Sequence, residues 1–479
     1  MVIVLGGGLS GLSAGYYLLK RFGKPAAIFE SSNRLGGWIR TENHQDKGFI
    51  FELGPRTIRP RGAAGANTLE MIEDLHLPTE SIRSTHIAAK NRMIYAKGEL
   101  CLLPNNLGGI FATRPPFSKP LYTALFHDLQ ASSKKIKYGD ESIYSFVKRR
   151  FGSELADYAI SPMICGICAG DAKEISVRFL MNDLFETEQQ YGGVVKGFFL
   201  SKLKGRKEVR DGHINSPGIF VENMPSLYQR AVKERWSMYR LIDGLETLPK
   251  ALETYLRSRN IEINLSSECT KILFGDDGVR LKIRDTMVLA EHVISSIPSY
   301  RLAACVKDQH PGLAGQLLAI PYVNVAVVNL QYCADNLLQQ RGFGFLVPPV
   351  ERRPILGVIF DSCCFEMGEN TVLTVMMGGK WFEEYFGQNP TKKDLLDIAL
   401  KEVEDILGIC QEPRFSRVHI LEKCIPQYNV GHKQVVEGIR RYIEHYKLSL
   451  SVCGAAYDGV GINDVIMSAR TNVENLSFS

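Results

Sequence analysis

The sequence predicts a mixed fold with α/β and α+β parts, and three observations lead to it. An apolar β-branched run at Val2–Leu5 leads directly into a glycine-rich turn and a helix, which is typical of a buried strand in a parallel sheet. Runs typical of antiparallel strands follow one another between residues 321 and 378. Helical patterns broken by proline fill residues 104–210. At 479 residues the chain is too long for one core, so we expect two or three domains.

The amino-terminal turn has the spacing of a dinucleotide site. Gly6, Gly8 and Gly11 form a G-x-G-x-x-G motif, which permits a tight turn, close approach of the backbone to a pyrophosphate, and close packing of helix on strand. A second strand at Ala26–Phe29 ends in Glu30, nineteen residues after Gly11, where an acidic side chain meets ribose hydroxyls. A lone motif of this kind is often only a glycine-rich turn. The strands, glycines, helix and acid in register predict a Rossmann-like dinucleotide-binding domain.

Composition and charge exclude several classes of protein. The chain is 45% hydrophobic and 23% charged with a mild net charge of +5, and we find no nucleic-acid-binding motif, so no nucleic-acid partner is expected. No stretch approaches the roughly 20 apolar residues that span a bilayer, and we expect no cleavable signal ahead of Val2. Eleven irregularly spaced cysteines predict reduced thiols. Cys165 and Cys168 alone make a poor zinc site, so we expect no metal.

The segment after Glu30 indicates which dinucleotide is bound. Ser31 to Arg40 read SSNRLGGWIR and resemble the stretch that continues the first motif along the pyrophosphate in the FAD-dependent amine-oxidase-like superfamily. The resemblance implies one non-covalent FAD for each subunit, in place of a diffusing nicotinamide. The alternative is a glycine-rich loop with two solvated arginines.

A turn close behind this segment places two arginines near the expected cofactor. Alternating residues at 49–53 predict a strand that ends in a turn at Gly54 and Pro55, and Arg56 and Arg59 follow at once. Solvated loop arginines are the alternative to a contact with the flavin or with an anionic substrate.

A third arginine lies in a predicted hairpin. A helix is expected at 66–76 and a hairpin at 88–103, whose first strand carries Arg92 among apolar residues. Such a charge usually lies on the solvent face of a strand, and the alternative is that Arg92 reaches a carboxylate.

The helical region carries a candidate membrane-surface segment. Tyr191 to Arg210 mix apolar side chains with six basic residues, which suits the boundary between acyl chains and anionic head groups. A solvated basic loop is the alternative.

The chain then returns to the dinucleotide domain, which is therefore discontinuous. Gly244 to Leu252 resemble a second signature of the same superfamily, a turn into a helix beside the cofactor. Strands are expected at 262–265, 279–283 and 292–297. Near the carboxyl end, Gly454 follows a buried strand, and residues 459–461 open a helix whose N-terminus suits the flavin ring.

Between these segments lies the predicted antiparallel sheet, which suits the roof of a substrate cavity. Its strands are expected at 323–332, 344–347, 355–360 and 372–377. The glycines at 342 and 344 let the backbone approach a flat ligand, and Phe343 and Leu346 offer apolar surfaces. Core packing is the alternative for each side chain taken alone.

The whole pattern resembles the protoporphyrinogen oxidase family of animal mitochondria. The resemblance extends over nearly the full length, in the motifs LGGGLSGLSA, ESSNRLGGWIR, FELGPRTIRP, AAKNRMIY, PPFSKPL, HVISSIP, AVVNLQY, GFGFLVP and CIPQYNVGH. It implies FAD-dependent oxidation of protoporphyrinogen IX to protoporphyrin IX in haem biosynthesis, with oxygen as acceptor and hydrogen peroxide as product. It further implies a homodimer, peripheral on the intermembrane-space side of the inner mitochondrial membrane, and hand-over of product to ferrochelatase.

The resemblance also implies the parts of the site and of the chain. The residues implied to bind FAD are Gly6, Gly8, Gly11, Glu30, Ser31, Arg34, Gly37, Trp38, Gly54, Pro55, Arg56, Cys269, Gly454, Val460, Ile462 and Asn463. Those implied to bind substrate are Arg92, for a propionate, and Gly166, Phe343, Gly344, Leu346 and Met376, around the macrocycle. The FAD-binding domain would comprise 1–60, 211–298 and 415–479, the antiparallel-sheet substrate domain 61–103 and 299–414, and the helical membrane-binding domain 104–210.

The chemistry that the resemblance implies needs few catalytic side chains. Flavin N5 can accept hydride from a carbon that bridges two electron-rich pyrroles, so the protein mainly positions the macrocycle, and no acid or base residue is assigned. Two positions depart from the family. Cys165 stands where the family often has an arginine, which puts a second anion contact there in doubt, and Lys433 replaces a tryptophan expected near the flavin.

Two other functions remain open from the sequence. An amine or polyamine oxidase shares the cofactor motifs but should have an aromatic cage for a cationic amine. A non-catalytic flavoprotein at the membrane surface is the second alternative.

Overall fold

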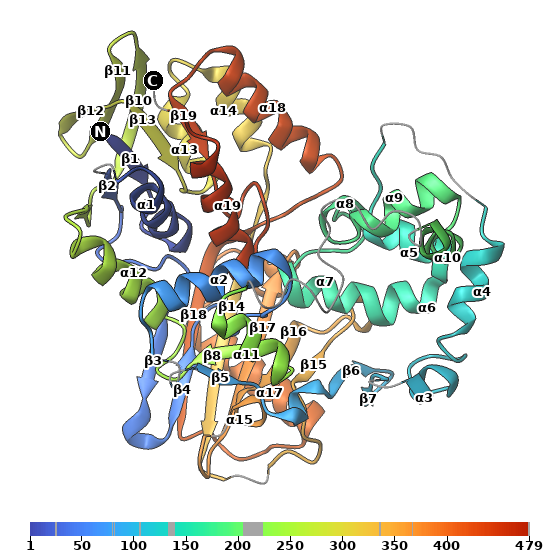
Figure 1. Cartoon of the computed structure of the whole chain (residues 1–479). Helices are drawn as coiled ribbons and strands as arrows, with labels where there is room; N and C mark the ends of the chain where they lie inside the picture. The colour runs from blue at the N-terminus through green and yellow to red at the C-terminus, as the bar shows by residue number, and fades with distance from the viewer. Residues whose placement is uncertain are drawn as a thin grey trace.

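Figure 1 shows the protein as a computed structural model of the whole chain. The structure describes residues 1–479 except 24–25, 79, 81, 105–106, 133–138, 205–223, 335–336, 366 and 478–479. The part of the Tyr191–Arg210 segment beyond residue 204 therefore lies outside the described residues. Among the helices that are described, none has both the length and the apolar character needed to cross a membrane.

A five-stranded parallel sheet is built from three distant segments of the chain, which confirms the predicted discontinuous Rossmann-like fold. Its strands in spatial order are β19 (Leu450–Val452), β13 (His292–Ser295), β1 (Val2–Leu5), β2 (Ala26–Phe29) and β9 (Glu262–Asn264). The amino-terminal strand lies at the centre, so the turn that follows it opens at the carboxyl edge of the sheet, where ligands of such sheets bind.

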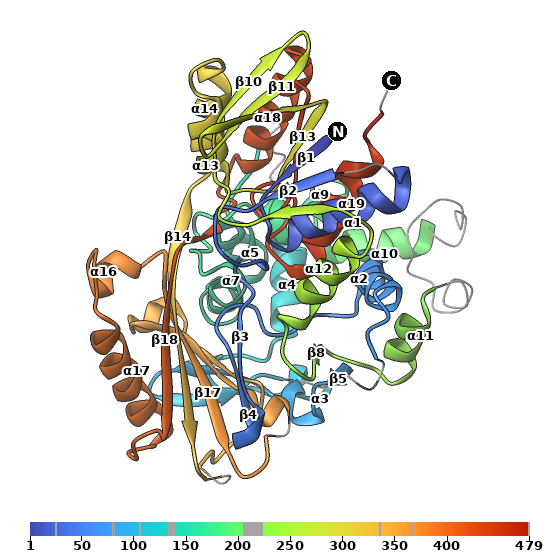
Figure 2. The same ribbon diagram turned by 90° about the vertical axis from the view of Figure 1, so that its left-hand side faces the viewer.

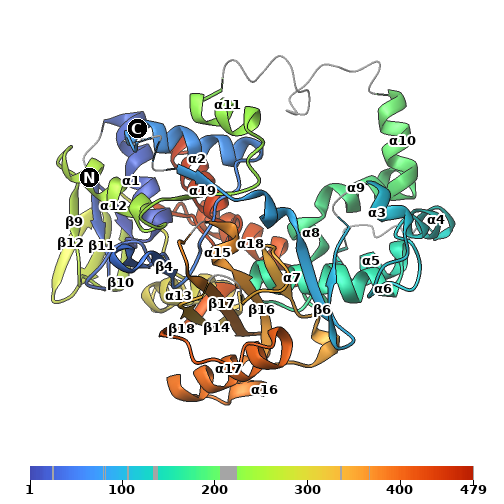
Figure 3. The ribbon, with the colours of Figure 1, turned by 90° about the horizontal axis from the view of Figure 1, so that it is seen from below.

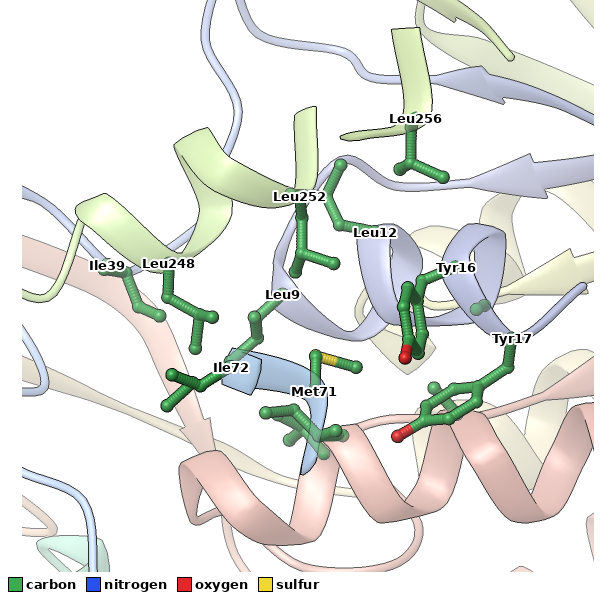
Figure 4. Close-up of a cluster of buried hydrophobic side chains, with 14 of the residues drawn as sticks. Leu9, Leu12, Tyr16, Tyr17, Ile39, Met71, Ile72, Leu248, Leu252 and Leu256 are labelled. Atoms are coloured by element: carbon green, nitrogen blue, oxygen red, sulfur yellow. The ribbon is translucent and has the colours of Figure 1, made fainter. Parts of the chain in front are cut away.

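Alternate residues of β1 supply two separate cores, as expected for a strand buried on both faces. Val2 and Val4 belong to a cluster with α1 (Leu9–Phe22), α2 (Gly62–Asp74), α12 (Thr247–Arg257) and α19 (Ile462–Glu474). Figure 4 shows Leu12 and Tyr16 of α1 facing Leu252 of α12 and Met71 of α2.

A different set of helices covers the opposite face of the parallel sheet. Ile3 and Leu5 pack with α13 (Ser299–Val306), α14 (Pro311–Leu318) and α18 (His432–His445). A three-stranded antiparallel sheet of β10 (Cys269–Gly275), β11 (Gly278–Ile283) and β12 (Thr286–Ala290) extends this cluster. Only the middle strand of the three was expected from the sequence.

A seven-stranded sheet forms the second large unit, and Figure 2 shows its long strands beside α17 (Lys392–Leu407). Its strands in spatial order are β18 (Phe415–Pro426), β14 (Tyr322–Tyr332), β17 (Thr371–Gly379), β16 (Ile355–Phe360), β15 (Gly344–Leu346), β6 (Arg92–Ala96) and β7 (Glu99–Leu102). All neighbouring strands are antiparallel except β15 and β6, which are parallel. The antiparallel sheet of four strands expected from the sequence is confirmed, and the predicted hairpin of β6 and β7 joins it through the parallel β15–β6 pair.

The sheet also extends further along the chain than the sequence indicated. We expected the last segment of the FAD-binding domain to begin at residue 415, yet β18 pairs with β14 over almost its whole length. Val323 of β14 pairs with Ile425 and Val325 pairs with Leu421, so three residues of β18, 422–424, stand opposite one residue of β14. This bulge in β18 interrupts the alternation expected of a strand.

Helices from residues 107 to 204 form a lobe at one end of the molecule, seen at the right of Figures 1 and 3. They are α3 (Leu107–Phe111), α4 (Thr123–Gln130), α5 (Ile143–Phe151), α6 (Ser153–Leu155), α7 (Ser161–Cys168), α8 (Val177–Leu180), α9 (Asn182–Tyr191) and α10 (Val194–Lys204), with a π-helical turn at Ala156–Ile160. Arg150 of α5 is fully buried and its Nε donates to Asp128 of α4 (2.6 Å). Asp128 also accepts the Val195 N–H (2.8 Å), so one carboxylate joins α4, α5 and α10.

Short elements connect these units. They are β3 (Thr41–His44), β4 (Phe49–Glu52), β5 (Ile82–Ser84), β8 (Tyr239–Leu241), α11 (Ser226–Lys233), α15 (Asp361–Cys364) and α16 (Phe382–Phe386). The helix expected at 66–76 is α2, which begins four residues earlier because two alanines extend it toward Gly62.

Candidate active site

The glycine turn after β1 is shaped by contacts that exclude larger residues. Gly6 has a φ of +103°, which favours glycine. A Cβ on Gly11 would lie 1.9 Å from the Gly6 carbonyl oxygen, so only glycine lets α1 approach the turn this closely. Gly8 caps α1 without any side-chain hydrogen bond, so the first N–H groups of the helix are free for an anion.

A second glycine turn packs on the first. The Gly36 N–H donates to the Gly7 carbonyl oxygen (2.9 Å), and a Cβ on Gly37 would lie 3.2 Å from the Gly8 Cα. Gly8 itself has room, since its Cβ would meet only the Gly37 Cα, at 3.7 Å. The structure therefore brings both predicted glycine segments to the N-terminus of α1.

Glu30 is held at the end of β2 by backbone groups. Its Oε2 accepts the Gly7 N–H (2.6 Å) and its Oε1 accepts the Ser32 N–H (2.8 Å). The Ser31 hydroxyl donates to the same Oε1 (3.3 Å). Each carboxylate oxygen retains further acceptor capacity, so Glu30 is positioned to receive ribose hydroxyls.

Arg34, the next residue predicted to bind FAD, stabilises the loop to which it belongs. Its Nη1 donates to the Gly37 carbonyl oxygen (2.7 Å), and its Nη2 donates to that of Ile39 and lies 3.6 Å from the Glu246 carboxylate. Trp38 lies in this loop with 42% of its surface exposed. The Arg34 guanidinium thus stabilises the backbone of its own loop. Glu246 supports this arginine, and the sequence analysis did not identify it.

A buried carboxylate that the sequence analysis missed links three segments of the site. Glu52 of β4 accepts the Leu245 N–H through Oε1 (2.7 Å) and the Thr41 hydroxyl through Oε2 (2.8 Å). Burial raises the pKa of Glu52 to about 7, although both hydrogen bonds and the positive charges of Arg56 and Arg240 lower it. Residues 49–53 are all buried, so the available signal was a carboxylate inside an apolar run.

Arg56 is directed away from solvent. It is 8% exposed, and its Nη1 lies 3.1 Å from Asp361 Oδ1, while Thr374 donates to the other carboxylate oxygen (2.6 Å). The turn before it is equally tight, since a Cβ on Gly54 would lie 2.2 Å from the Trp38 carbonyl oxygen. Pro55, between them, is exposed.

The carboxyl-terminal part of the site is a loop between β19 and α19. Gly454 has a φ of +100°, and a Cβ there would lie 2.8 Å from Ser10 Oγ, so the loop lies against the start of α1. The Tyr428 hydroxyl accepts the Gly459 N–H (2.6 Å) and donates to the Ala455 carbonyl oxygen (2.7 Å). Tyr428 is thus a supporting residue, found only through the structure.

Three residues predicted to bind FAD follow the loop that Tyr428 stabilises. Val460 and Ile462 are half-buried, and Val460 packs against the helical lobe. Asn463 donates through Nδ2 to the Arg59 carbonyl oxygen (2.7 Å), while its Oδ1 is buried with no hydrogen-bond partner. An unsatisfied buried oxygen at the N-terminus of α19 fits a donor from a bound ligand.

Cys269 lies close along the chain to a backbone contact with Glu30. It follows Ser267, whose N–H donates to the Glu30 carbonyl oxygen (2.7 Å). The Cys305 thiol donates to the Cys269 carbonyl oxygen (3.1 Å), so the Cys269 backbone is held in place.

The predicted substrate residues gather around β15. Arg92 and Gly344 are partners in the β6–β15 pair, and the Arg92 guanidinium lies 5.0 Å from the centre of the Phe343 ring. Leu346 reaches toward α7, where a Cβ on Gly166 would lie 2.8 Å from Leu346 Cδ2. The Leu346 side chain therefore fills the space that a larger residue at position 166 would need.

Met376 extends the same wall from β17. It is opposite Gly357 of β16, whose Cβ would lie 3.1 Å from Leu346 Cδ2. Phe343, Leu346 and Met376 are each half-buried, whereas most of their strand neighbours are fully buried. Met376 packs on the cluster that contains Cys165, whereas Phe343 packs on Cys364, so each of these apolar side chains is only partly covered by its neighbours.

The departures from the family pattern are clear in the structure. Cys165 is 1% exposed, and burial raises the pKa of its thiol, so it stays neutral. Lys433 is exposed on α18 and lies 3.9 Å from Glu437.

Comparison with known proteins identifies the family. A family model described as flavin-containing amine oxidoreductase matches residues 9–477. The chain belongs to this family. The dinucleotide cradle identifies its flavin as FAD, and the free N–H groups of α1 and the unsatisfied Asn463 oxygen fit that cofactor.

Individual relatives cover nearly the whole chain. Human protoporphyrinogen oxidase is 39% identical, with 98% of this chain and 96% of the human protein aligned. A candidate protoporphyrinogen oxidase from Exiguobacterium sp. 255-15 has a crystal structure that matches with a TM-score of 0.79 at 23% identity, over 99% of this chain and 97% of that one. The structure of cyclohexylamine oxidase from Brevibacterium oxydans IH-35A matches with a TM-score of 0.67 at 14% identity, over 99% of this chain and 98% of that one. The two structures show the fold alone.

We predict that Gly8→Ala weakens FAD binding without unfolding the protein. The added Cβ has room in the protein but would occupy space next to the N-terminus of α1, so we expect the FAD affinity to fall at least about tenfold, or ~1.4 kcal/mol. Titration of the apoprotein with FAD, together with its thermal unfolding, measures both effects. Gly315→Ala on α14, where nothing lies within 4 Å, is the matched control. An unchanged affinity of the Gly8 variant would contradict the assignment.

We also predict a pH-dependent stability that depends on Glu52. Its pKa in the folded protein, about 7, lies above the ordinary 4.5, so the folded state binds this proton more tightly. The resulting stabilisation is complete below about pH 4 and is lost as the pH rises through 7, which amounts to roughly 3 kcal/mol. Urea unfolding should therefore show the wild type losing stability relative to Glu52→Gln between about pH 5 and 8. If the free energies of unfolding of the two proteins changed with pH in parallel, the prediction would be wrong. Glu253→Gln, on the surface of α12, is the control.

Proposed function

We propose that the protein oxidises protoporphyrinogen IX to protoporphyrin IX with FAD and oxygen, releasing hydrogen peroxide. The observation that supports it most is the 39% identity to human protoporphyrinogen oxidase over 98% of the chain. The substrate is a flat apolar macrocycle with two carboxylates. An apolar wall with a guanidinium at its edge has matching chemistry.

The residues of this wall would orient the macrocycle. Phe343, Leu346 and Met376 offer apolar contacts, while glycine at position 166 lets Leu346 pack against α7 and glycine at position 344 lets β15 approach the Val358 carbonyl oxygen of β16. Arg92 would bind one carboxylate by charge-assisted hydrogen bonds, and its contact with the Phe343 ring keeps cation and wall together. FAD supplies the two-electron oxidation when it is bound. The protein's contribution is positioning and exclusion of water, and we assign no acid or base residue.

The cofactor would be held by the glycine turns, Glu30 and the N-terminus of α19. Residues proposed to contact FAD are Gly6, Gly8, Gly11, Glu30, Ser31, Gly37, Trp38, Gly54, Pro55, Cys269, Gly454, Val460, Ile462 and Asn463. For Arg34 and Arg56 we propose a supporting role, since their guanidiniums bind Gly37 and Asp361 respectively. We propose the domain roles of the sequence analysis, with the substrate sheet extended through Pro426.

The helical lobe is proposed to rest on a membrane surface. Apolar side chains of α3, α4 and α10 are exposed there, namely Phe111, Leu125, Phe126, Leu129, Phe198 and Phe199. Helices α4 and α10 pack together, and Figures 1 and 3 place them at the end of the molecule away from β12. Phe111 and Phe199 are 67% and 62% exposed, with the exposed Lys196 on the same helix as Phe199. Exposed phenylalanines beside a lysine suit anionic lipid head groups.

The finer setting of the reaction rests on the resemblance alone. We propose the intermembrane-space side of the inner mitochondrial membrane, a homodimer, and hand-over of product to ferrochelatase. An amine oxidase function has less support, because the matching cyclohexylamine oxidase is 14% identical to this chain, against 39% for human protoporphyrinogen oxidase.

The proposed oxidation predicts a sharp effect of Arg92. The purified flavoprotein should produce porphyrin fluorescence and peroxide from protoporphyrinogen IX in air faster than heat-killed protein. Arg92→Ala should lower kcat/KM about 10- to 100-fold, because a charge-assisted hydrogen bond of about 1.5–3 kcal/mol is lost. Arg280→Ala, exposed on β11, is the control and should change little. Turnover of amines but not of porphyrinogen would overturn the proposal, and a flavin that no substrate reduces would indicate a non-catalytic flavoprotein.

The membrane proposal predicts that two phenylalanines govern binding to lipid. Phe198→Ser combined with Phe199→Ser should weaken binding to vesicles of phosphatidylcholine and phosphatidylserine by about tenfold or more, since their apolar area no longer enters the acyl boundary. Vesicle co-sedimentation measures the bound fraction. Met287→Ser with Leu289→Ser, two exposed apolar residues of β12, forms the matched control. Equal losses from both pairs would argue against the lobe as the contact surface.

A further inference from the structure

Arg240, in the middle of β8, is a buried cation without a partner in the described part of the chain. It is 8% exposed, and its Nε is buried with no hydrogen bond. No carboxylate among the described residues forms an ion pair with its guanidinium, whereas Arg56, which is buried to the same extent, pairs with Asp361 (3.1 Å). Burying an unpaired charge is costly. The Arg240 guanidinium therefore indicates a partner that the polypeptide does not supply.

Two carboxylates act on Arg240 through their charge. Burial lowers the pKa of Arg240, and the negative charges of Asp361 and Glu52 oppose that effect. Both carboxylates are held by other groups, Asp361 by Arg56 and Glu52 by the Leu245 N–H (2.7 Å). Neither therefore neutralises Arg240 by direct contact.

Backbone pairing places Arg240 next to the turn proposed to hold FAD. The preceding residue, Tyr239, exchanges two backbone hydrogen bonds with Ile58, each 2.9 Å long. Ile58 follows Arg56 by two residues, and the turn itself begins at Gly54. Arg240 is thus one residue away from a direct backbone contact with the segment that follows this turn.

Ring contacts connect Arg240 to the substrate wall. Its guanidinium lies 4.2 Å from the centre of the Phe365 ring. Phe365 and Cys364 belong to a buried cluster against which Phe343 packs, and the Cys364 thiol donates to the Phe343 carbonyl oxygen (3.8 Å). Arg92 lies on the Phe343 ring, at 5.0 Å from its centre. Two guanidiniums therefore contact one aromatic cluster, each through a different ring.

A second unsatisfied polar atom lies on the same side of β8. The Thr85 N–H donates to the Met238 carbonyl oxygen (2.9 Å), which continues the antiparallel pairing of β5 with β8. Thr85 is therefore opposite Met238, which shares a face of β8 with Arg240, two residues further on. Thr85 Oγ1 is buried and has no hydrogen-bond partner in the described chain. An unsatisfied guanidinium and hydroxyl on one face suit a carboxylate.

The proposed substrate presents carboxylates at the edge of a flat apolar body. We propose that Arg240 binds the second carboxylate of protoporphyrinogen IX, with the Thr85 hydroxyl as a further donor, while Arg92 binds the first. This inference rests on the proposed function. The aromatic cluster between the two guanidiniums matches the apolar body of the macrocycle.

The test compares the binding of protoporphyrin IX and of its dimethyl ester to the FAD-loaded enzyme, by fluorescence quenching. Arg240→Met should raise the Kd for the diacid about tenfold, or about 1.4 kcal/mol, and change the Kd for the dimethyl ester less than about twofold. Equal changes for the two porphyrins, or no change for either, overturn the site. Thr85→Val, which replaces only a hydroxyl by a methyl group, should raise the Kd for the diacid about threefold, and it keeps the test decisive if Arg240→Met does not fold.

A double-variant cycle shows whether Arg240 and Arg92 bind separate carboxylates. Arg92→Met alone should also weaken binding of the diacid about tenfold, and the two substitutions together about a hundredfold, because contacts with different carboxylates contribute independently. A double variant that binds no more weakly than either single variant would place both arginines on one carboxylate and overturn the assignment. Arg259→Met is the matched control, since this exposed arginine also lies on an aromatic ring, 3.6 Å from the centre of Tyr255.

Turnover separates this inference from the function on which it rests. In Arg240→Met, KM for protoporphyrinogen IX should rise about tenfold with kcat within about twofold and with an unchanged midpoint potential of the flavin, because the lost contact affects substrate binding. A shifted potential with an unchanged Kd for the diacid would assign Arg240 to the flavin and overturn the inference. A wild type that prefers the diacid to its ester but oxidises no porphyrinogen overturns the proposed function alone.

Discussion

The contact between Gly11 and the Gly6 carbonyl oxygen is the constraint on which the rest of this structure depends. It sets the distance between β1 and α1, and thereby the direction in which the free N–H groups of α1 point. Because β1 is the central strand of its sheet, every other part of the site is placed relative to this turn. The second glycine turn packs on the first, and the carboxyl-terminal loop lies against Ser10. Three chain segments thus share one reference point.

Buried polar groups then join the elements around the five-stranded sheet to the seven-stranded sheet. Glu52 binds the Thr41 and Leu245 segments, while the neighbouring Arg56 reaches Asp361 of α15, next to the sheet. These groups are costly to bury unless each finds a partner. Their pairing therefore specifies one relative placement of the two domains, more strictly than apolar contacts would.

Much of this arrangement could be predicted from the sequence, where local pattern and spacing carry the information. The strand, glycines and Glu30 of the amino-terminal motif, and the hairpin that holds Arg92, have short-range signals, and the structure has the same elements. Strand β18 was not predicted, because a bulge within it interrupts the alternation. Glu52, Glu246 and Tyr428 were missed for another reason. Their roles arise from partners that are distant in sequence, such as the Leu245 and Gly459 N–H groups, and no local pattern reports these.

The parallel pairing of β6 with β15 has a consequence for how such a site can change over time. Both strands run in one direction, so Arg92 and Phe343 reach the same end of the strand pair although the whole helical lobe and strands β9 and β13 of the parallel sheet lie between them in sequence. Parallel neighbours need a long crossover, and here that crossover holds whole domains. Insertions or deletions within it leave the register of the two strands untouched. The lobe can therefore diversify its outer surface while the geometry of cation and aromatic ring is inherited unchanged.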